Sequence, residues 1–160
     1  MHDDMQSIRT AILSKYGSLT EPRFDFVQAA LDADEYRNVI QDLRSTFELS
    51  EDTDPNDDVS FGLLLRGELS SYVLRLSMIG RYAVLLRVDE RNRSQVVDPD
   101  APASAEERTI LETLRRFEIE PLARVTLTIQ IPLELSNTTC ASCRLYQALF
   151  TDTDVLPWEA

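Results

Sequence analysis

The chain has 160 residues and a mass of 18.2 kDa, with 43% apolar and 28% charged residues, the composition of an ordinary globular domain. Its formal charge of −12 opposes binding to nucleic acid, which depends on basic residues at phosphates. No apolar run approaches the roughly 20 residues that cross a bilayer, and residues 1–4 lack the basic start of a secretory signal. We therefore expect a cytoplasmic protein without membrane contact.

The negative charge is concentrated in the first third of the chain. Residues 1–58 carry 14 acidic and 5 basic side chains, whereas residues 59–160 carry 14 and 11. Such a field attracts a protein with a basic surface and speeds the encounter, although an acidic surface also simply increases solubility. The carboxylates that we expect to meet a basic partner are Asp32, Asp34, Glu35, Glu51, Asp52, Asp54, Asp57 and Asp58.

The first predicted helix covers residues 4–16. Its apolar side chains recur at helical spacing and form one stripe, which consists of Met5, Ile8, Ile12 and Tyr16. Asp3 or Asp4 is expected to cap its first turn, because a carboxylate there accepts hydrogen bonds from free backbone N–H groups. Gly17 is expected to end it, since glycine readily adopts the left-handed conformation.

Two shorter helices are expected next. The second begins after Thr20 and has Pro22 in its first turn, where the missing N–H of proline costs little. Asp32 or Asp34 is predicted to cap the third helix. Residues 50–58 are rich in Asp, Ser, Thr and Pro, and they are predicted to form a polar loop.

After this loop the hydrophobic pattern changes from helical to alternating. Three runs, at residues 59–65, 72–78 and 82–88, predict a three-strand meander. Gly80-Arg81 separates the second run from the third. A glycine at the first turn position is typical of a type II′ turn, so we expect a tight hairpin here.

The chain beyond the meander predicts one helix and up to two strands. A brief strand is expected at residues 95–97. Ser104 followed by Glu107 is a capping box, and apolar residues at helical spacing follow it. Strict alternation over residues 125–131 then predicts a later strand, which Pro132 ends.

The chain is predicted to end in a last helix and a short tail. Asn137 or Thr138 is expected to cap this helix, which carries four apolar residues between 145 and 150. Trp158 in the tail is expected to fold back onto the body, because its ring has a large apolar area to bury.

Together these elements predict a single α+β domain over residues 1–160. Residues 1–49 form a helical acidic part, and residues 59–160 form the sheet and two helices. The sheet is expected to be mainly antiparallel, with about four strands: the meander and one later strand. Helices from the N-terminal, middle and C-terminal parts of the chain are expected to pack against it.

The motif that most resembles a reactive site is Cys140-Ala141-Ser142-Cys143. It follows the predicted late strand and opens the predicted last helix, where the helix dipole would lower the pKa of a thiol. These four residues and their context resemble a thioredoxin motif, which implies thiol–disulfide exchange through Cys140 and Cys143. The alternative is that small residues simply pack at the start of a helix.

Other catalytic and metal sites are not expected. A Ser-His-Asp triad is not expected, because the one histidine is His2, near the start of the chain. A closed zinc site needs four ligands, and Cys140 and Cys143 supply two, so such a site would require the same pair from a second copy of the chain. Residues 52–57 resemble the opening of a calcium loop, but Asp57 stands where the loop needs glycine. Asp152 and Asp154 are interpreted as a polar turn. We expect no metal, no cofactor and no enzyme activity.

A non-catalytic protein-binding function is therefore the main hypothesis. The small acidic chain is similar in type to cytoplasmic immunity proteins, whose acidic surfaces cover basic, nuclease-like toxins. Alternatively, the order of elements from residue 34 onward resembles small acidic secretion chaperones, which implies a chaperone or adaptor and commonly a homodimer. That resemblance covers about three quarters of the chain and lacks a second strand before the last helix. A thiol redox protein using Cys140 and Cys143 is the third hypothesis.

Overall fold

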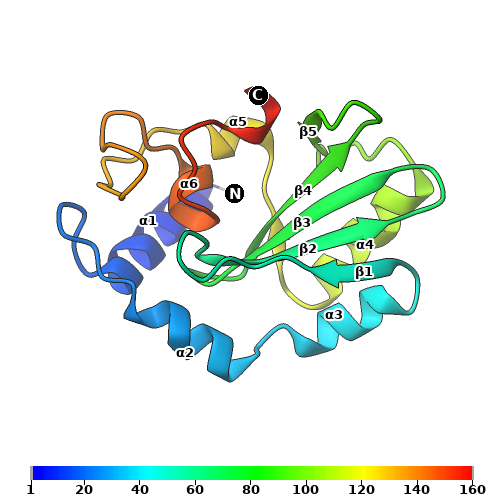
Figure 1. The fold of residues 1–160 in the computed structure, drawn as a ribbon, viewed down its shortest axis with the longest axis horizontal. Coiled ribbons are helices and arrows are strands. Elements are labelled where there is room, and N and C mark those ends of the chain that lie inside the picture. The colour runs from blue at the N-terminus through cyan, green and yellow to red at the C-terminus, as the bar shows by residue number, and fades with distance from the viewer. Residues whose placement is uncertain (1, 160) are drawn as a thin grey trace.

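The structure is a computed structural model that describes the backbone of residues 2–159 and the side chains of residues 5–159. It has the predicted α+β architecture, with one mostly antiparallel sheet and helices from the N-terminal, middle and C-terminal parts of the chain (Figure 1). The helices are α1 (His2–Tyr16), α2 (Asp25–Ala33), α3 (Arg37–Arg44), α4 (Ala105–Arg116), α5 (Arg124–Leu127), α6 (Leu145–Leu149) and the 3₁₀ helix η1 (Pro157–Glu159).

The sheet has six strands within the described residues. They are β1 (Glu48–Glu51), β2 (Ser60–Arg66), β3 (Ser71–Ser77), β4 (Tyr82–Val88), β5 (Ser94–Val96) and β6 (Glu120–Pro121). The first five pair with their neighbours in sequence order, and every one of these pairs is antiparallel. The short strand β6 pairs with β4 in parallel. The meander β2–β3–β4 and the brief strand β5 are confirmed close to their predicted positions.

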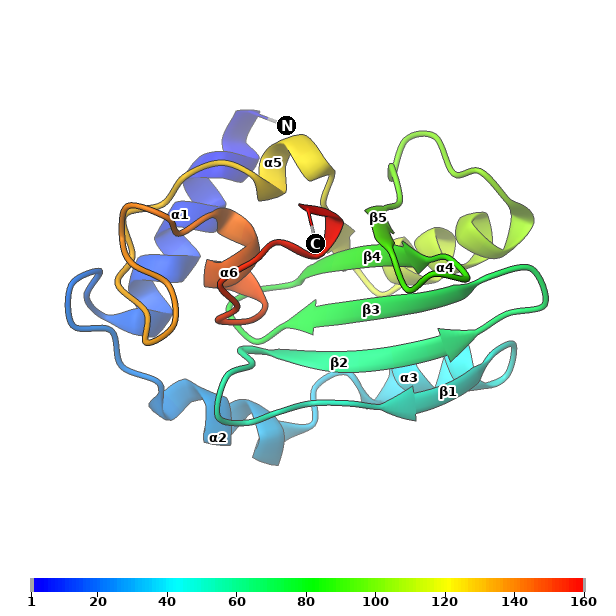
Figure 2. The same ribbon diagram turned by 45° about the horizontal axis from the view of Figure 1, so that its top comes forward.

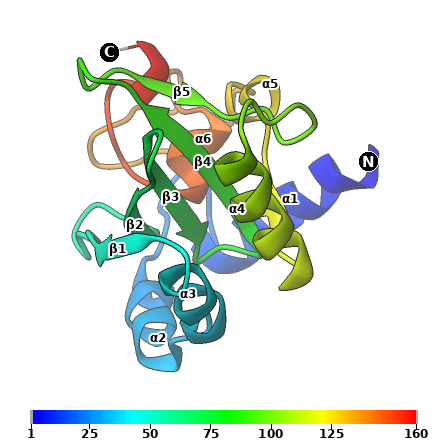
Figure 3. The same ribbon diagram turned by 90° about the vertical axis from the view of Figure 1, so that its right-hand side faces the viewer.

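The two faces of the sheet have different coverings. One face of the sheet is covered by α3 and α4 (Figures 2 and 3). Neighbouring strands pair three buried leucines with each other, Leu63 of β2, Leu74 of β3 and Leu85 of β4. At one end of the opposite face, the hydroxyls of Ser60 and Ser77 donate to backbone carbonyls at the end of α6, at 2.6 and 2.7 Å. These two hydrogen bonds fix the C-terminal part of the chain to the sheet.

The hairpin at Gly80 is present, but it is not the tight type II′ turn that we predicted. A type II′ turn needs a positive φ at its first central residue, and Gly80 does not have one. The connection runs over residues 78–81 instead. The hydroxyl of Tyr36 donates to the carbonyls of Ser77 and Gly80, at 2.6 and 3.2 Å, so a side chain from outside the hairpin holds its backbone.

The predicted strand over residues 125–131 is wrong. Its first residues form the one-turn helix α5, in which Val125 is 76% exposed and Leu127 is fully buried. The chain rejoins the sheet earlier, at β6. Both β5 and β6 pair with β4, so they take the positions beside β4 that a later strand would need. Conversely, β1 includes residues 50 and 51 of the predicted polar loop, because their backbone pairs with β2 despite their polar side chains.

Three predicted helix starts are also wrong. The second helix starts at Asp25, so Pro22 lies before it rather than in its first turn. Neither Asp32 nor Asp34 caps α3, since Asp34 is the left-handed C-cap residue of α2, with φ of 49°. The last helix starts at Leu145, so neither Asn137 nor Thr138, in the loop before it, is its cap. The predicted caps of α1, Asp3 and Asp4, lie outside the described side chains.

The helix α4 starts where the capping box predicts. Ser104 accepts a hydrogen bond from the backbone N–H of Glu107 at 3.2 Å. The Glu107 carboxylate does not return this bond to Ser104. It accepts instead from the N–H of Ala103 at 2.9 Å and forms a two-pronged ion pair with Arg87 of β4, at 2.6 and 2.8 Å. This ion pair ties α4 to the sheet.

One hydrophobic core includes residues from both ends of the chain. Gly17 ends α1 with φ of 77°, as predicted, and the α1 stripe reaches the core through Ile8, Ile12 and Tyr16. The tail folds back as expected, with Trp158 packed edge-on against Tyr146 at a ring-centroid distance of 5.3 Å. Within the described residues, the helices are too short or too polar to cross a membrane.

Candidate functional site

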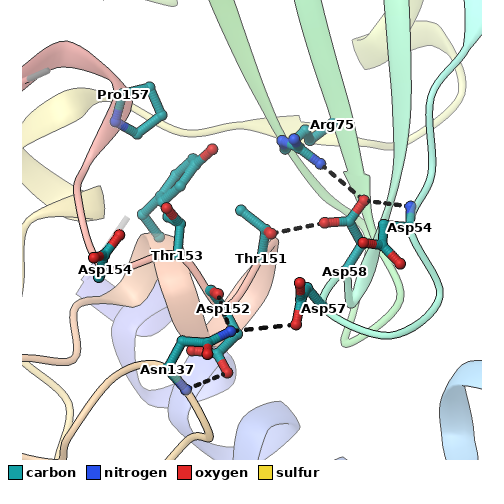
Figure 4. A pocket seen from close by; sticks show the side chains of 11 residues that line it. Asp54, Asp57, Asp58, Arg75, Asn137, Thr151, Asp152, Thr153, Asp154 and Pro157 are labelled. Carbon is teal, nitrogen blue, oxygen red and sulfur yellow. Dashed lines mark hydrogen bonds and ion pairs between the residues drawn. The ribbon is translucent and has the colours of Figure 1, made fainter.

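The strongest candidate site is a cleft of about 520 Å³ between two segments that are far apart in the sequence (Figure 4). One segment is the loop between β1 and β2, and the other follows α6. Together with β3, α6 and the loop before α6, they contribute the lining residues Asp54, Asp57, Asp58, Arg75, Asn137, Tyr146, Thr151, Asp152, Thr153, Asp154 and Pro157. We call this feature the acidic cleft, because five of these residues are aspartates.

Backbone pairing holds the two segments of the acidic cleft together. Asp58 and Thr151 form an isolated antiparallel bridge outside the main sheet. On either side of it, the N–H of Val59 donates to the carbonyl of Phe150 and the N–H of Asp152 donates to the carbonyl of Asp57, both at 3.0 Å. The cleft is therefore built on a short two-stranded ribbon and not on two free loops.

The carboxylate of Asp58 lies at the centre of this ribbon, with only 7% of its side chain exposed. It accepts hydrogen bonds from the backbone N–H of Asp54 at 2.8 Å and from the hydroxyl of Thr151 at 2.7 Å. It also pairs with the guanidinium of Arg75, whose Nη1 lies 3.4 Å away (Figure 4). Asp58 thus joins both segments to β3, and its oxygens are already engaged inside the protein.

The carboxylate of Asp152 is similarly engaged, in this case with the loop before α6. It accepts from the backbone N–H of Asn137 at 2.8 Å and from the hydroxyl of Thr138 at 2.9 Å. The side-chain amide of Asn137 donates to Asp57 at 3.2 Å and so links the loop before α6 to the β1–β2 loop (Figure 4). Asp152 and Asn137 thus hold the loop before α6 in place beside the cleft.

Three exposed aspartates remain to define the charge of the cleft. Asp54 and Asp57 come from the first segment and Asp154 from the second, and all three have exposed side chains. Of the described residues that line the cleft, Arg75 alone carries a positive charge, and it pairs with Asp58. The cleft is therefore a region of concentrated negative charge, which suits the guanidinium or ammonium group of a ligand.

Gly62 of β2 allows the first segment to reach the cleft. The N–H of Asp52 donates to the carbonyl of Gly62 at 2.8 Å, and the N–H of Gly62 donates to the hydroxyl of Thr53 at 3.0 Å. A β-carbon on Gly62 would collide with the backbone carbonyl oxygen of Asp52. The absence of a side chain at this position lets the segment lie directly on the sheet.

The structure separates the carboxylates that the sequence predicted as partner-binding. Asp54, Asp57 and Asp58 line the acidic cleft, although Asp58 is buried there. The other predicted residues lie elsewhere: Asp32, Asp34 and Glu35 lie at the joint of α2 and α3, Glu51 pairs with Arg44, and Asp52 is exposed beside β2. Asp34 also pairs with Arg37 at 2.9 Å.

Sequence reasoning missed the second half of the cleft. Asp152 and Asp154 were interpreted as a polar turn, because nothing in their local sequence points to residues near position 57. Arg75 falls in the strand predicted over residues 72–78, and no role was predicted for its side chain. The one available signal is compositional, since Asp152-Thr153-Asp154 is a second short acidic run. Only the return of the C-terminal segment to the β1–β2 loop brings the two runs together.

The two cysteines lack the setting that the thioredoxin-like motif implies. Cys140 and Cys143 lie in the loop before α6 and do not open a helix. Burial raises the pKa of Cys143 to about 12, and the Glu134 carboxylate raises the pKa of the exposed Cys140 thiol. The expected lowering of a thiol pKa is therefore wrong, because the Cys140–Cys143 segment does not open a helix and the Glu134 carboxylate and burial act in the opposite direction.

The exposed carboxylates of the acidic cleft suit recognition of a cationic group. Among the described residues, no group of three or more His, Cys, Asp or Glu side chains is placed to hold a metal ion. Neither a protein-family model, nor a curated protein, nor a solved structure matches this chain.

Proposed function

We propose that this protein is a non-catalytic binding domain that holds a basic region of a partner protein in the acidic cleft. The supporting observation is the convergence of Asp54, Asp57 and Asp154 from two distant segments onto one cleft, whose one described cation is paired with Asp58. The cationic side chains of a basic partner would form favourable interactions with these carboxylates. The net charge of −12 would also steer such a partner towards this protein.

Within this class, we favour a cytoplasmic immunity protein that neutralises a toxin with a basic, nuclease-like surface. A toxin that binds nucleic acid must present cations for phosphates, and these cations match exposed carboxylates. The rigid support of the cleft, through the Asp58 and Asp152 hydrogen bonds, lowers the entropic cost of binding one fixed surface.

The two alternative functions have less support. A dimeric chaperone would use a continuous apolar face, whereas the large exposed apolar side chains of the described residues each belong to a different element or loop: Leu13, Phe24, Leu64, Leu69, Val125 and Val155. A thiol enzyme would need an easily formed thiolate, and the raised pKa values of Cys140 and Cys143 oppose one.

Affinity capture from the native host, followed by mass spectrometry, tests the proposal. The native chain is compared with Asp57→Asn/Asp154→Asn, which removes two charges from the cleft. The matched control is Asp32→Asn/Glu35→Gln, which removes two charges at the α2–α3 joint. We expect one basic protein to be recovered with the native chain and the control, and to be depleted with the cleft variant.

The recovered protein then separates the functional alternatives. Immunity predicts that it is toxic when expressed alone and harmless when co-expressed with this chain, whereas a chaperone client is insoluble alone and soluble together. Stopped-flow mixing of the purified pair should show slower association and a weaker salt dependence for the cleft variant. Loss of binding in the α2–α3 control, with the cleft variant unaffected, would refute the assignment to the cleft.

A further inference from the structure

A second recess lies against the acidic cleft and has a mixed lining. It has a volume of about 230 Å³, with an apolar side formed by Tyr16, Phe24, Val27, Val59 and Leu135 and a polar side that includes Asn56, Ser136 and Gln147. Asp57, Asp58 and Asp152 line both the recess and the acidic cleft, so the two cavities share a wall. We call this second cavity the Phe24 recess.

The walls of the Phe24 recess are already ordered. Phe24 is 39% exposed, and its ring lies edge-on to the ring of Tyr16, with centroids 5.6 Å apart. The hydroxyl of Tyr16 donates to the buried carbonyl of Ala148 at 2.6 Å, so this residue offers the recess its apolar ring. Val27 and Leu135 are each 7% exposed and are fixed by the core.

The size and surroundings of the recess define an occupant. A cavity of about 150 Å³ is large enough for a benzene-sized group, so the larger volume of the Phe24 recess has room for one aromatic or branched aliphatic side chain. The carboxylates on its shared wall favour a cation beside that side chain and disfavour an anion. A side chain that anchors in a pocket of the partner is the usual form of a binding hot spot.

We propose that the Phe24 recess binds one apolar side chain of the partner protein, next to an arginine or lysine that enters the acidic cleft. This inference rests on the proposed function and specifies the partner sequence: an exposed, extended segment in which an aromatic or aliphatic residue neighbours a basic one. The basic residue supplies the electrostatic complementarity, and the apolar residue supplies the shape selection.

The test uses three short peptides, acetyl-Arg-Phe-Arg-amide, acetyl-Arg-Gly-Arg-amide and acetyl-Glu-Phe-Glu-amide. Each is titrated into the ¹⁵N-labelled full chain while backbone amide shifts are followed by NMR. We expect the first peptide to shift amides around both Phe24 and Asp57 in a saturable way. The second should shift only those of the acidic cleft and bind several-fold more weakly, and the third should not bind.

Variants of Phe24 assign the apolar part of this affinity. Phe24→Ala should weaken the first peptide by about 10-fold, the equivalent of losing part of one buried aromatic side chain, and leave the second unchanged. Phe24→Leu should restore most of the binding, which excludes a folding defect at this position. Leu69→Ala, which removes an exposed apolar side chain at the β2–β3 turn, should have no effect.

Three results would overturn the proposal. They are equal affinities for the first and second peptides, an unchanged affinity in Phe24→Ala, or a native chain that sediments as a dimer while Phe24→Ala sediments as a monomer. The last result would mean that a second copy covers the recess. If host capture fails but the peptide behaves as expected, the proposed function falls and the recess stands. If the host partner binds Phe24→Ala as well as the native chain, the recess proposal alone falls.

Discussion

Replacing Asp58 by alanine should disrupt the support of the acidic cleft. The buried carboxylate accepts bonds from the Asp54 N–H at 2.8 Å and the Thr151 hydroxyl at 2.7 Å, and it pairs with Arg75. Each hydrogen bond to a charged group contributes roughly 1.5–3 kcal/mol, and breaking a buried ion pair costs roughly 3–5 kcal/mol. Because these contributions overlap and 18% of the Arg75 side chain is exposed, we expect a total loss of about 3 kcal/mol.

Urea unfolding, followed by the fluorescence of Trp158 and by circular dichroism, measures this loss. With a slope of roughly 2 kcal/mol per molar urea, the midpoint should fall by about 1.5 M. The matched control is Asp57→Ala, which removes the neighbouring exposed carboxylate and should stay within about 0.5 kcal/mol of the native chain. If Asp58→Ala loses less than about 1 kcal/mol, or no more than the control, then Asp58 does not hold the two segments together.

Three further predictions concern the sheet and the cysteines. Burial alone would raise the pKa of Glu107, but hydrogen bonds from Arg87 and the backbone outweigh it and lower the pKa below the ordinary value of 4.5. The ionised Glu107 therefore stabilises the folded state fully above pH 4.5, and this contribution is lost as the pH falls through the lowered pKa. Arg87→Met should therefore destabilise by about 3 kcal/mol at pH 7 and by clearly less at pH 3, and an equal loss in urea melts at both values would contradict the ion-pair account. Gly62→Ala should cost about 1–3 kcal/mol in thermal unfolding, because backbone faces the added methyl group, and an unchanged melting temperature would show that the segment can move aside. Iodoacetamide at pH 8 should modify the exposed Cys140 slowly, because the pKa of its thiol is raised, and the buried Cys143 only after denaturation. Mass spectrometry measures both rates, and rapid modification of both cysteines would contradict the assigned burial.

Strong local patterns were sufficient for much of the fold. The alternation of β2, β3 and β4 reflects one face packed on helices, and the Ser104–Glu107 spacing places a hydroxyl at the first free N–H groups of α4. Both patterns depend on residues a few positions apart, so they can be read without knowing the partner element. The same holds for Gly17, whose positive φ ends α1.

Alternation misled the prediction for residues 125–131. Leu127 and Ile131 are buried as a strand would require, but the first residues of the segment form α5, and β5 and β6 take the partner positions beside β4. Residues 129–131 pair instead with residues 143–145, outside the sheet. Whether an apolar, β-branched run becomes a strand depends on a neighbouring strand with unpaired N–H and C=O groups. That neighbour is set by the topology and not by the run itself.

The acidic cleft illustrates the division between sequence and tertiary structure. The sequence by itself determined the net charge, the acidic run near Asp57 and the expectation of a basic partner, because charge and local composition need no fold. Only the tertiary structure brought Asp152 and Asp154 to that run, buried Asp58 against Arg75 and placed the Phe24 recess beside them. The physical reason is that the ribbon of residues 57–59 and 150–152 depends on long-range backbone pairing, which no local pattern encodes.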